Sequence, residues 1–400
     1  MLNVVTVKEA TEILENSFTP YFETELLPLE EALNRITAED IVSLEMIPAF
    51  DRSTVDGYAL KSSDTYGAGE NMPSFLHIKG EILMGEEAEE SISSGECMKI
   101  STGGMLPQGA DSVIMVEYTD EGFDGMCLCL KATSPFENVT KKGDDVKTGD
   151  VVVKKGTVIT SKTVGVLCAL GITSVKCVKK PTVGIISTGD EIIDYSEKPA
   201  FGQIRDINSV LLATLLKENG CDVINFGIVR DKKDELERVF SDALGKCDAV
   251  LLSGGSSKGE RDMTALIISE KGELLFHGLA MKPGKPTILG KCENKAVFGL
   301  PGHPAAAYYV FYRVVLPFIK TLMGVSEKES FHKYPLGIDI PSNHGREEVV
   351  SVKTEDGKIY PVYGKSGLVS LLSESDGYII IDRNREGAFL GEETEVYFTK

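Results

Sequence analysis

The sequence predicts a multidomain protein of α/β plus β class. Its 400 residues exceed one ordinary hydrophobic core, so two to four domains are expected. From about residue 181 to 324, strand-like and helix-like runs alternate, which is typical of a mostly parallel, three-layer sheet. From about residue 48 to 136, and again in the last part of the chain, short apolar runs are separated by Gly, Pro and Asp. That pattern indicates two small β domains.

The first 47 residues are predicted to be helical. Apolar residues recur at helical spacing within Val7–Leu14, and Thr6 before them is a suitable N-cap. Pro28 is expected at the first position of a second helix, and Gly171 is expected to end a third, Thr163–Leu170. The first β domain is expected to contain the strands Phe75–Ile78, Met98–Ile100, Ser112–Val116 and Met126–Leu130.

The elements of the α/β stretch are expected to follow one another closely. Gly220 should stop its first helix, and Pro317 should break or kink its last one. The expected order is strand Thr182–Ile186, helix Ser209–Glu218, strand Asp222–Ile228, helix Glu235–Leu244, strand Asp248–Leu252, helix Met263–Ser269, strand Ala296–Phe298 and helix Ala305–Leu322.

The composition restricts the partners and the compartment. A formal charge of −19 argues against a nucleic-acid groove, and no basic cluster indicates a membrane surface. No apolar run reaches the roughly 18 residues that span a bilayer, and the N-terminus has no signal-peptide core. We therefore expect a cytoplasmic protein whose eight cysteines are reduced thiols.

Polar loops follow four of the expected α/β strands. In open parallel sheets, ligands bind outside the carboxyl ends of the strands, so these loops should converge on one crevice. The glycines and serines of Ser253–Asp262 could hold a phosphate on backbone N–H groups, although a plain Gly-rich connection is the alternative. Glu191, Asp231 and Asp262 could together hold Mg²⁺, although each alone could be a helix cap or a surface charge. The loops are Ser187–Glu191, Arg230–Asp231, Ser253–Asp262 and Leu300–Pro304.

Two lysines flank a Pro-Gly turn shortly before the last of these loops. Lys282 and Lys285 would fix two ammonium groups on a rigid turn of an acidic protein, which suggests an anion site. A solvated turn with incidental lysines is an equal alternative on this segment alone. The first β domain has polar turns around Asp56 and Thr102, and an acidic turn with Asp145 follows it in the chain. By their residues alone, these three read as ordinary turn chemistry.

Six motifs occur in one order along the chain: FDRSTVDGYA, STGGMLPQGAD, STGDE, SGGSSKGERD, MKPGKP and LPGHP. Together they resemble the MoeA family of molybdopterin molybdenumtransferases, whose eukaryotic relatives include the E domain of gephyrin. The resemblance implies an elongated homodimer. It implies a discontinuous domain of residues 1–47 and 139–178, an inserted β domain of residues 48–138, a MogA-like α/β domain of residues 179–325 and a small β-barrel of residues 326–400.

The resemblance also implies a reaction and a set of site residues. Family members insert molybdate into adenylylated molybdopterin and release AMP in a Mg²⁺-dependent step. A MogA-type adenylyltransferase and molybdoenzyme chaperones are the protein partners that this implies. The implied catalytic residues are Asp56, Thr102, Asp145, Glu191, Asp231 and Asp262, with Asp262 and Glu191 as metal ligands. The implied substrate-binding residues are Thr188, Gly189, Ser253, Gly254, Gly255, Lys282, Lys285, Pro301, Gly302, Pro304, Arg346 and Ser366.

The chain departs from the family pattern at three positions. His303 stands where Asn is common, Ala306 stands where Ser is common, and Lys258 replaces a small or apolar residue. These departures leave the oxyanion contacts, and the choice between molybdate and tungstate, open. Tungstate insertion by the same chemistry and a gephyrin-like scaffold role are the alternative functions.

Overall fold

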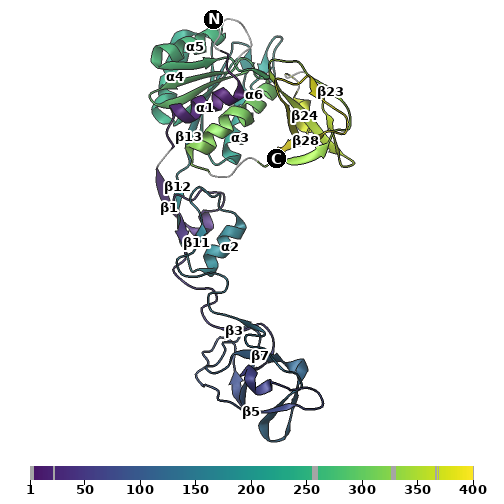
Figure 1. Cartoon of the computed structure of the whole chain (residues 1–400). Coiled ribbons are helices and arrows are strands. Elements are labelled where there is room, and N and C mark those ends of the chain that lie inside the picture. Colours follow the sequence, from purple (N-terminus) through teal and green to yellow (C-terminus); the bar gives the residue numbers. More distant parts are fainter. Residues whose placement is uncertain are drawn as a thin grey trace.

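The molecule is elongated (Figure 1). The computed structural model describes residues 4–20, 23–254, 260–325, 330–364, 367 and 369–399. An α/β sheet and a C-terminal β domain lie side by side at one end, and the first β domain lies at the other. A narrow arm joins the two ends. The predicted fold class is confirmed, whereas the residue boundaries of the domains stay a prediction.

The α/β region is a six-stranded sheet between two helical layers, as its alternating pattern predicts. Successive residues of a strand point to opposite faces. Ile185 therefore packs with the helices α3, α6 and α7, and Ile186 packs with α4 and α5. Four strands are parallel, in the order β16 (Asp222–Val229), β13 (Thr182–Thr188), β17 (Ala249–Gly254) and β21 (Lys295–Leu300), followed by antiparallel β20 (Ile288–Cys292) and β18 (Glu273–His277). The helices are α3 (Asn208–Glu218), α4 (Lys233–Lys246), α5 (Glu260–Lys271), α6 (Pro304–Val310) and α7 (Leu316–Leu322).

Two of the predicted helices differ in the structure. The helix expected to begin at Pro28 is wrong: strand β1 (Thr24–Pro28) pairs with β12 (Ser174–Val178), and only a short 3₁₀ turn follows. A strand partner that is distant in sequence overrides the local helix signal here. The expected helix Ala305–Leu322 is divided by a π-helical turn, Phe311–Val315, which lies just before Pro317.

The N-terminal helix α1 (Val7–Ser17) is confirmed together with its cap. The backbone N–H of Glu9 donates to Thr6 Oγ1 at 3.1 Å, which satisfies a free donor of the first turn. Leu14 and Phe18 pack in the same core as α7, so α1 belongs to the α/β end of the molecule. None of the described helices is long and apolar enough to span a membrane.

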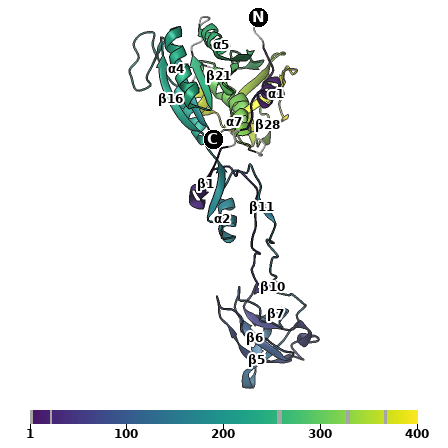
Figure 2. The same ribbon diagram turned by 90° about the vertical axis from the view of Figure 1, so that its left-hand side faces the viewer.

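The arm is thin because its strands form only two-stranded sheets in the part of the chain that the structure describes. Figure 2 shows two long connectors running side by side from β11 to the first β domain. Ile47 and Val146 link the connectors, since the N–H of Ile47 donates to the carbonyl of Val146 at 2.8 Å. The elements of the arm are β1, β12, β2 (Ile41–Val42), β11 (Val151–Val153) and α2 (Ser161–Ala169).

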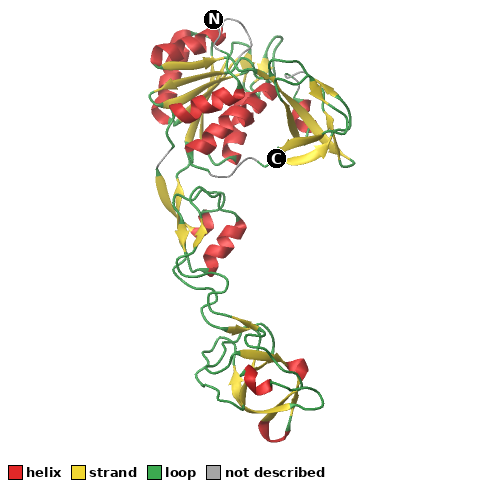
Figure 3. Ribbon diagram, viewed as in Figure 1, coloured by secondary structure: helices red, strands yellow, loops and turns green. Residues whose placement is uncertain are grey.

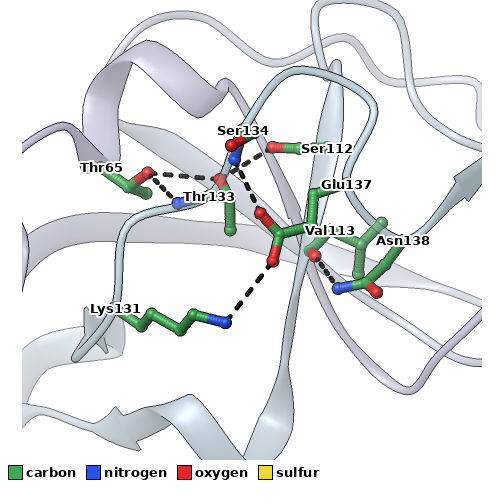
Figure 4. Close-up of polar contacts among 8 residues, drawn as sticks. All are labelled: Thr65, Ser112, Val113, Lys131, Thr133, Ser134, Glu137 and Asn138. Carbon is green, nitrogen blue, oxygen red and sulfur yellow. Dashed lines mark hydrogen bonds and ion pairs between the residues drawn. The ribbon is translucent and has the colours of Figure 1, made fainter.

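The first β domain is built around one six-stranded sheet, and its four predicted strands are confirmed. A buried hydroxyl network fixes the returning loop: Thr133 Oγ1 lies 3.2 Å from Thr65 Oγ1 and 3.0 Å from Ser112 Oγ (Figure 4). Glu137 accepts the N–H of Ser134 in the same loop. The sheet order is β7 (Ser112–Met115), β4 (Gly57–Leu60), β6 (Glu96–Ile100), β5 (Ser74–Ile82), β9 (Met126–Cys129) and β8 (Thr119–Glu121), with β3 (Arg52–Ser53) and β10 (Val139–Thr140) at the neck.

The C-terminal β domain is joined to the α/β region by a shared strand pair. Strand β19 (Met281–Lys282) leaves the α/β region and pairs in parallel with β24 (Glu347–Glu355). Strands and helices are distinguished in Figure 3. The remaining elements are β22 (His332–Pro335), β23 (Ile340–Pro341), β25 (Lys358–Pro361), α8 (Ser370–Glu374), β26 (Gly377–Ile381), β27 (Gly387–Ala388) and β28 (Glu393–Phe398), and the small pair β14 (Ile192–Ile193) and β15 (Ile204–Arg205) lies in the α/β region.

Candidate functional site

The carboxyl ends of β13, β17 and β21 form one edge of the α/β sheet, called here the carboxyl edge. Thr188 is in register with Gly254, and Ser253 is in register with Leu300. A Cβ on Gly254 would lie 2.2 Å from Thr188 Oγ1, so only glycine fits beside this threonine. The predicted convergence of the strand-end loops holds for Thr188, Ser253 and Gly254. Gly255 lies outside the described residues.

Asn208 connects these loops, and sequence reasoning missed it. Its Nδ2 lies 2.8 Å from Ser253 Oγ and within 3.0 and 3.3 Å of the carbonyls of Gly302 and Pro301. The side chain is only 6% exposed. Asn208 is the first residue of α3, and that helix begins at the carboxyl edge. A polar residue opening a helix between two strand-end loops was the available signal.

The lysine turn also lies at the carboxyl edge. Strand β20 runs antiparallel to β21, so the turn before Ile288 adjoins the end of β21 at Gly299. Lys282 Nζ lies 2.7 Å from Glu348 Oε1 of the C-terminal domain, whereas Lys285 is exposed. An oxyanion bound at this turn would have to share Lys282 with that carboxylate.

The second Pro-Gly turn opens helix α6. His303 occupies its N-cap position, Pro304 begins the helix, and Ala306 is buried within it. A Cβ on Gly367 would lie 4.0 Å from His303 Nε2, which places the loop of the C-terminal domain beside this turn. Ser366 itself and Lys258 lie outside the described residues. Arg346 is exposed and directly precedes β24, the strand that pairs with the lysine turn.

Acidic residues follow β13 and β16 at the same edge. Glu191 is half-buried beside Gly189, and the N–H of Asp231 lies 3.4 Å from Asp190 Oδ1. The side chain of Asp262 lies outside the described part. Within that part, no three His, Cys, Asp or Glu side chains are grouped to hold a metal. Mg²⁺ usually takes one or two carboxylates together with substrate phosphates, so this loose set suits a metal that arrives with its ligand.

Asp56 and Thr102 form a separate polar pair. The N–H and hydroxyl of Thr102 donate to Asp56 Oδ1 at 2.6 and 2.9 Å. These two hydrogen bonds, the backbone one first, lower the pKa of Asp56 below its ordinary value. The pair lies in the first β domain, at the opposite end of the molecule from the carboxyl edge (Figure 1). Asp145 is exposed on a connector of the arm. One chain therefore does not bring these three residues to the carboxyl edge.

Comparison with known families decides where the chain belongs. Its residues 5–171 match the MoeA N-terminal region (domain I and II), residues 184–321 match a probable molybdopterin binding domain, and residues 333–399 match the MoeA C-terminal region (domain IV). The chain belongs to the MoeA family. The family predicted from the six motifs is thereby confirmed.

Named relatives and solved structures agree with this membership. The molybdopterin molybdenumtransferase of Haemophilus influenzae is 35% identical over 89% of this chain and 91% of its own length. A putative molybdopterin biosynthesis protein of Methanocaldococcus jannaschii is 36% identical over 100% of this chain and 99% of its own. The crystal structure of a molybdopterin biosynthesis MoeA protein from Pyrococcus horikoshii OT3 is 34% identical and has a TM-score of 0.89, covering 99% of this chain and 100% of that one. The prediction of an enzyme of the transferase class agrees with these names.

Proposed function

We propose that this protein is a molybdopterin molybdenumtransferase. In this proposal it inserts molybdate into adenylylated molybdopterin and releases AMP in a Mg²⁺-dependent step. The observation that carries the proposal is the convergence of the strand-end loops and the lysine turn at the carboxyl edge, held together by Asn208. Both substrates are anions, and this edge combines close backbone approach with fixed positive charge.

The proposed roles follow from the chemistry of the residues at this edge. Gly254 and Gly189 let backbone amides approach the pterin phosphate, because a side chain at either position would meet Thr188 or Ile192. Lys285 supplies the ammonium group for molybdate, and Lys282 shares its charge between the oxyanion and Glu348. Further ligand contacts are proposed for Thr188, Ser253, Gly255, Pro301, Gly302, Pro304, Arg346 and Ser366.

The acidic residues are proposed to serve cleavage of the adenylate. Glu191 and Asp262 would hold Mg²⁺ together with substrate phosphate, and Asp231 would lie beside them. The metal, when bound, supplies polarisation of the phosphate that is cleaved. The residues of the carboxyl edge are proposed to hold that phosphate in one position. A separate MogA-type adenylyltransferase is the proposed source of the adenylylated substrate.

Asp56, Thr102 and Asp145 are proposed to act on the partner's site in a homodimer. They lie on the arm and on the first β domain, far from the carboxyl edge of their own chain. We propose a two-fold dimer, the commonest homo-oligomer, in which each first β domain lies against the other subunit. The position of the Asp56–Thr102 pair supports this arrangement, because its carboxylate is exposed and kept ionised by Thr102.

The test is incubation of the purified protein with adenylylated molybdopterin, Mg²⁺ and molybdate. AMP release and reconstitution of an apo-molybdoenzyme are measured. We expect both products, and we expect AMP release to slow when molybdate is left out, because cleavage of the adenylate is proposed to require the bound oxyanion. Absence of AMP and of active cofactor would refute the proposed function. Replacing molybdate by tungstate in the same assay determines the oxyanion preference.

A further inference from the structure

A cavity lies at the edge of the α/β sheet opposite the carboxyl edge. Helix α3 begins at the carboxyl edge with Asn208 and ends at Glu218, close to the start of β16 at Asp222. Glu218 and Lys180, which precedes β13, line this cavity of about 440 Å³. The cavity is therefore separated from the candidate site by the length of the strands. Its volume falls within the range of about 300–1,000 Å³ that is typical of small-molecule sites.

Three parts of the molecule contribute to the walls of this cavity. Arg35 comes from the base of the arm, Lys320 comes from α7, and Phe398 comes from the last strand of the C-terminal domain. Ligand sites occur preferentially at such junctions between domains. A ligand bound here would contact all three parts at once and would restrict their relative motion.

The charge of the walls is opposite to the charge of the protein. Arg35, Lys180 and Lys320 face one carboxylate, Glu218, whereas the whole chain carries −19. Arg35 is already engaged, since its guanidinium donates to Glu25 at 2.5 Å and to the carbonyl of Val178 at 2.8 Å. Among the described residues, neither Lys180 nor Lys320 forms an ion pair. These two lysines are the groups that would attract an anion.

Aromatic rings form the apolar part of the walls. Tyr378 and Tyr397 are stacked, with ring centroids 5.3 Å apart, and Phe398 next to them is 42% exposed. Tyr312 lies in the π-helical turn between α6 and α7. Such turns occur frequently at functional sites, because they re-aim side chains that a regular helix would direct elsewhere. Rings beside these two lysines suit a ligand that is itself aromatic and anionic.

We propose that this cavity binds a small ligand in which an aromatic ring system carries a phosphate or carboxylate group, about the size of a mononucleotide. The anionic group contacts Lys180 and Lys320, and the ring lies against Tyr312 and Phe398. Because the ligand contacts the base of the arm, its binding restricts how the arm carries the first β domain toward a partner subunit. This effect on the partner's site rests on the proposed function, whereas binding itself does not.

Binding is tested by titrating the full-length protein with AMP, adenosine and inorganic phosphate in a calorimeter. AMP is also a product of the proposed reaction, so the titration is repeated with the variant Lys285→Ala, which alters the carboxyl edge alone. We expect Lys285→Ala to retain one AMP-binding event. We expect adenosine and inorganic phosphate each to bind at least about tenfold more weakly than AMP at this event.

Charge reversal in the cavity provides the decisive comparison. Lys320→Glu is expected to weaken this AMP-binding event by about tenfold or more. The matched control is Lys217→Glu, an exposed lysine of α3 that does not line the cavity and should bind AMP as the wild type does. Phe398→Ala, which keeps the charges, should weaken AMP but leave phosphate unchanged. Equal AMP affinity in Lys320→Glu and in the wild type overturns the proposal, and so does phosphate binding as tight as that of AMP.

Loss of cofactor synthesis in the transferase assay does not test ligand binding in the cavity. If the transferase assay fails and the Lys320-dependent binding remains, the proposed function is refuted and the cavity stands. If the assay succeeds and AMP binding is lost only in Lys285→Ala, the cavity proposal is refuted and the proposed function stands.

Discussion

The first β domain and the carboxyl edge of the α/β sheet both bury polar side chains, but they use them differently. In the first β domain, the hydroxyls of Thr65, Ser112 and Thr133 bond to one another inside a single sheet domain (Figure 4). At the carboxyl edge, one amide group of Asn208 holds segments that lie 45 and 93 residues further along the chain. The first network closes a domain, and the second holds loops to which the proposed function assigns a ligand.

This difference teaches which buried polar groups indicate function. A buried hydroxyl cluster that satisfies itself within one domain needs no ligand to explain it. The buried amide of Asn208 is instead bonded to backbone carbonyls of a loop distant in the chain, and so fixes the position of that loop. The first β domain instead presents its functional candidates, Asp56 and Thr102, on its surface.

The largest expected effect comes from Asp56, because it tests whether the two regions act together. Asp56→Ala is expected to lower kcat/KM of the transferase assay by about 100-fold. Mixing Asp56→Ala chains with Lys285→Ala chains should restore about one quarter of the wild-type activity, because half of the dimers carry one intact site. The control is Asp64→Ala, which removes a carboxylate bonded in the same way to Ser94 and Gly95. No restoration on mixing would mean that the sites are not shared between subunits.

Asn208 provides the next largest effect. Asn208→Ala leaves Ser253 Oγ and the carbonyls of Pro301 and Gly302 without their donor, and it is expected to cost about 2–3 kcal/mol of unfolding free energy. The chain contains no tryptophan, so urea unfolding is followed by circular dichroism. Asn219→Ala at the other end of α3 also removes a side-chain bond, to Leu215, but should leave transferase activity intact. Equal activity losses in both variants would contradict the role assigned to Asn208.

Thr133 tests the structural network of the first β domain. Thr133→Val keeps the shape of the side chain but removes the hydroxyl between Thr65 and Ser112. It should lower the free energy of unfolding by about 1–2 kcal/mol. The KM for adenylylated molybdopterin should not change, because the network does not contact the surface pair. The control is Thr119→Val, which removes a hydroxyl that donates to the nearby carbonyl of Val116, and it should be nearly neutral. A changed KM in Thr133→Val would remove the distinction between the two networks.

The smallest expected effect is a pKa change at Asp56. Thr102→Val removes the hydroxyl bond and keeps the backbone N–H bond, so the pKa of Asp56 should rise only part of the way to its ordinary value. Since the folded-state pKa is lowered, this bond stabilises the protein above the ordinary pKa, and the stabilisation is lost as the pH falls through the lowered value. NMR titration of the carboxyl carbon measures the change. The control is Asp194, whose pKa is lowered by hydrogen bonds from Ser196 and should be the same in the wild type and in Thr102→Val.

Local patterns predicted most of the elements but not every partner. The N-cap at Thr6, the strands of the first β domain and the alternation of the α/β region are short-range features, and they are confirmed. Strand β1 was mistaken for the approach to a helix because β12, its partner, lies about 150 residues away in the chain. The antiparallel strands β18 and β20 were also missed, although their partners lie close to them in the chain.

The candidate site was predictable where it depended on strand ends and not where it depended on contacts across domains. The loops after β13, β17 and β21 could be placed together because parallel strands end at one edge. The bonds of Asn208 and the ion pair between Lys282 and Glu348 could not, since each depends on a distance between segments that only packing fixes.

By itself, the sequence determined the class of fold, the order of the strand-end loops and the family, because periodicity and ordered motifs are properties of the chain alone. Only the tertiary structure decided that Lys282 is shared with a carboxylate of the C-terminal domain. It also decided that Asp56 lies at the far end of an arm from the carboxyl edge of its own chain. The physical reason is that ion pairs between domains, and the distances between residues of different domains, depend on how the domains pack. Domain packing is set by contacts between residues that are distant in sequence.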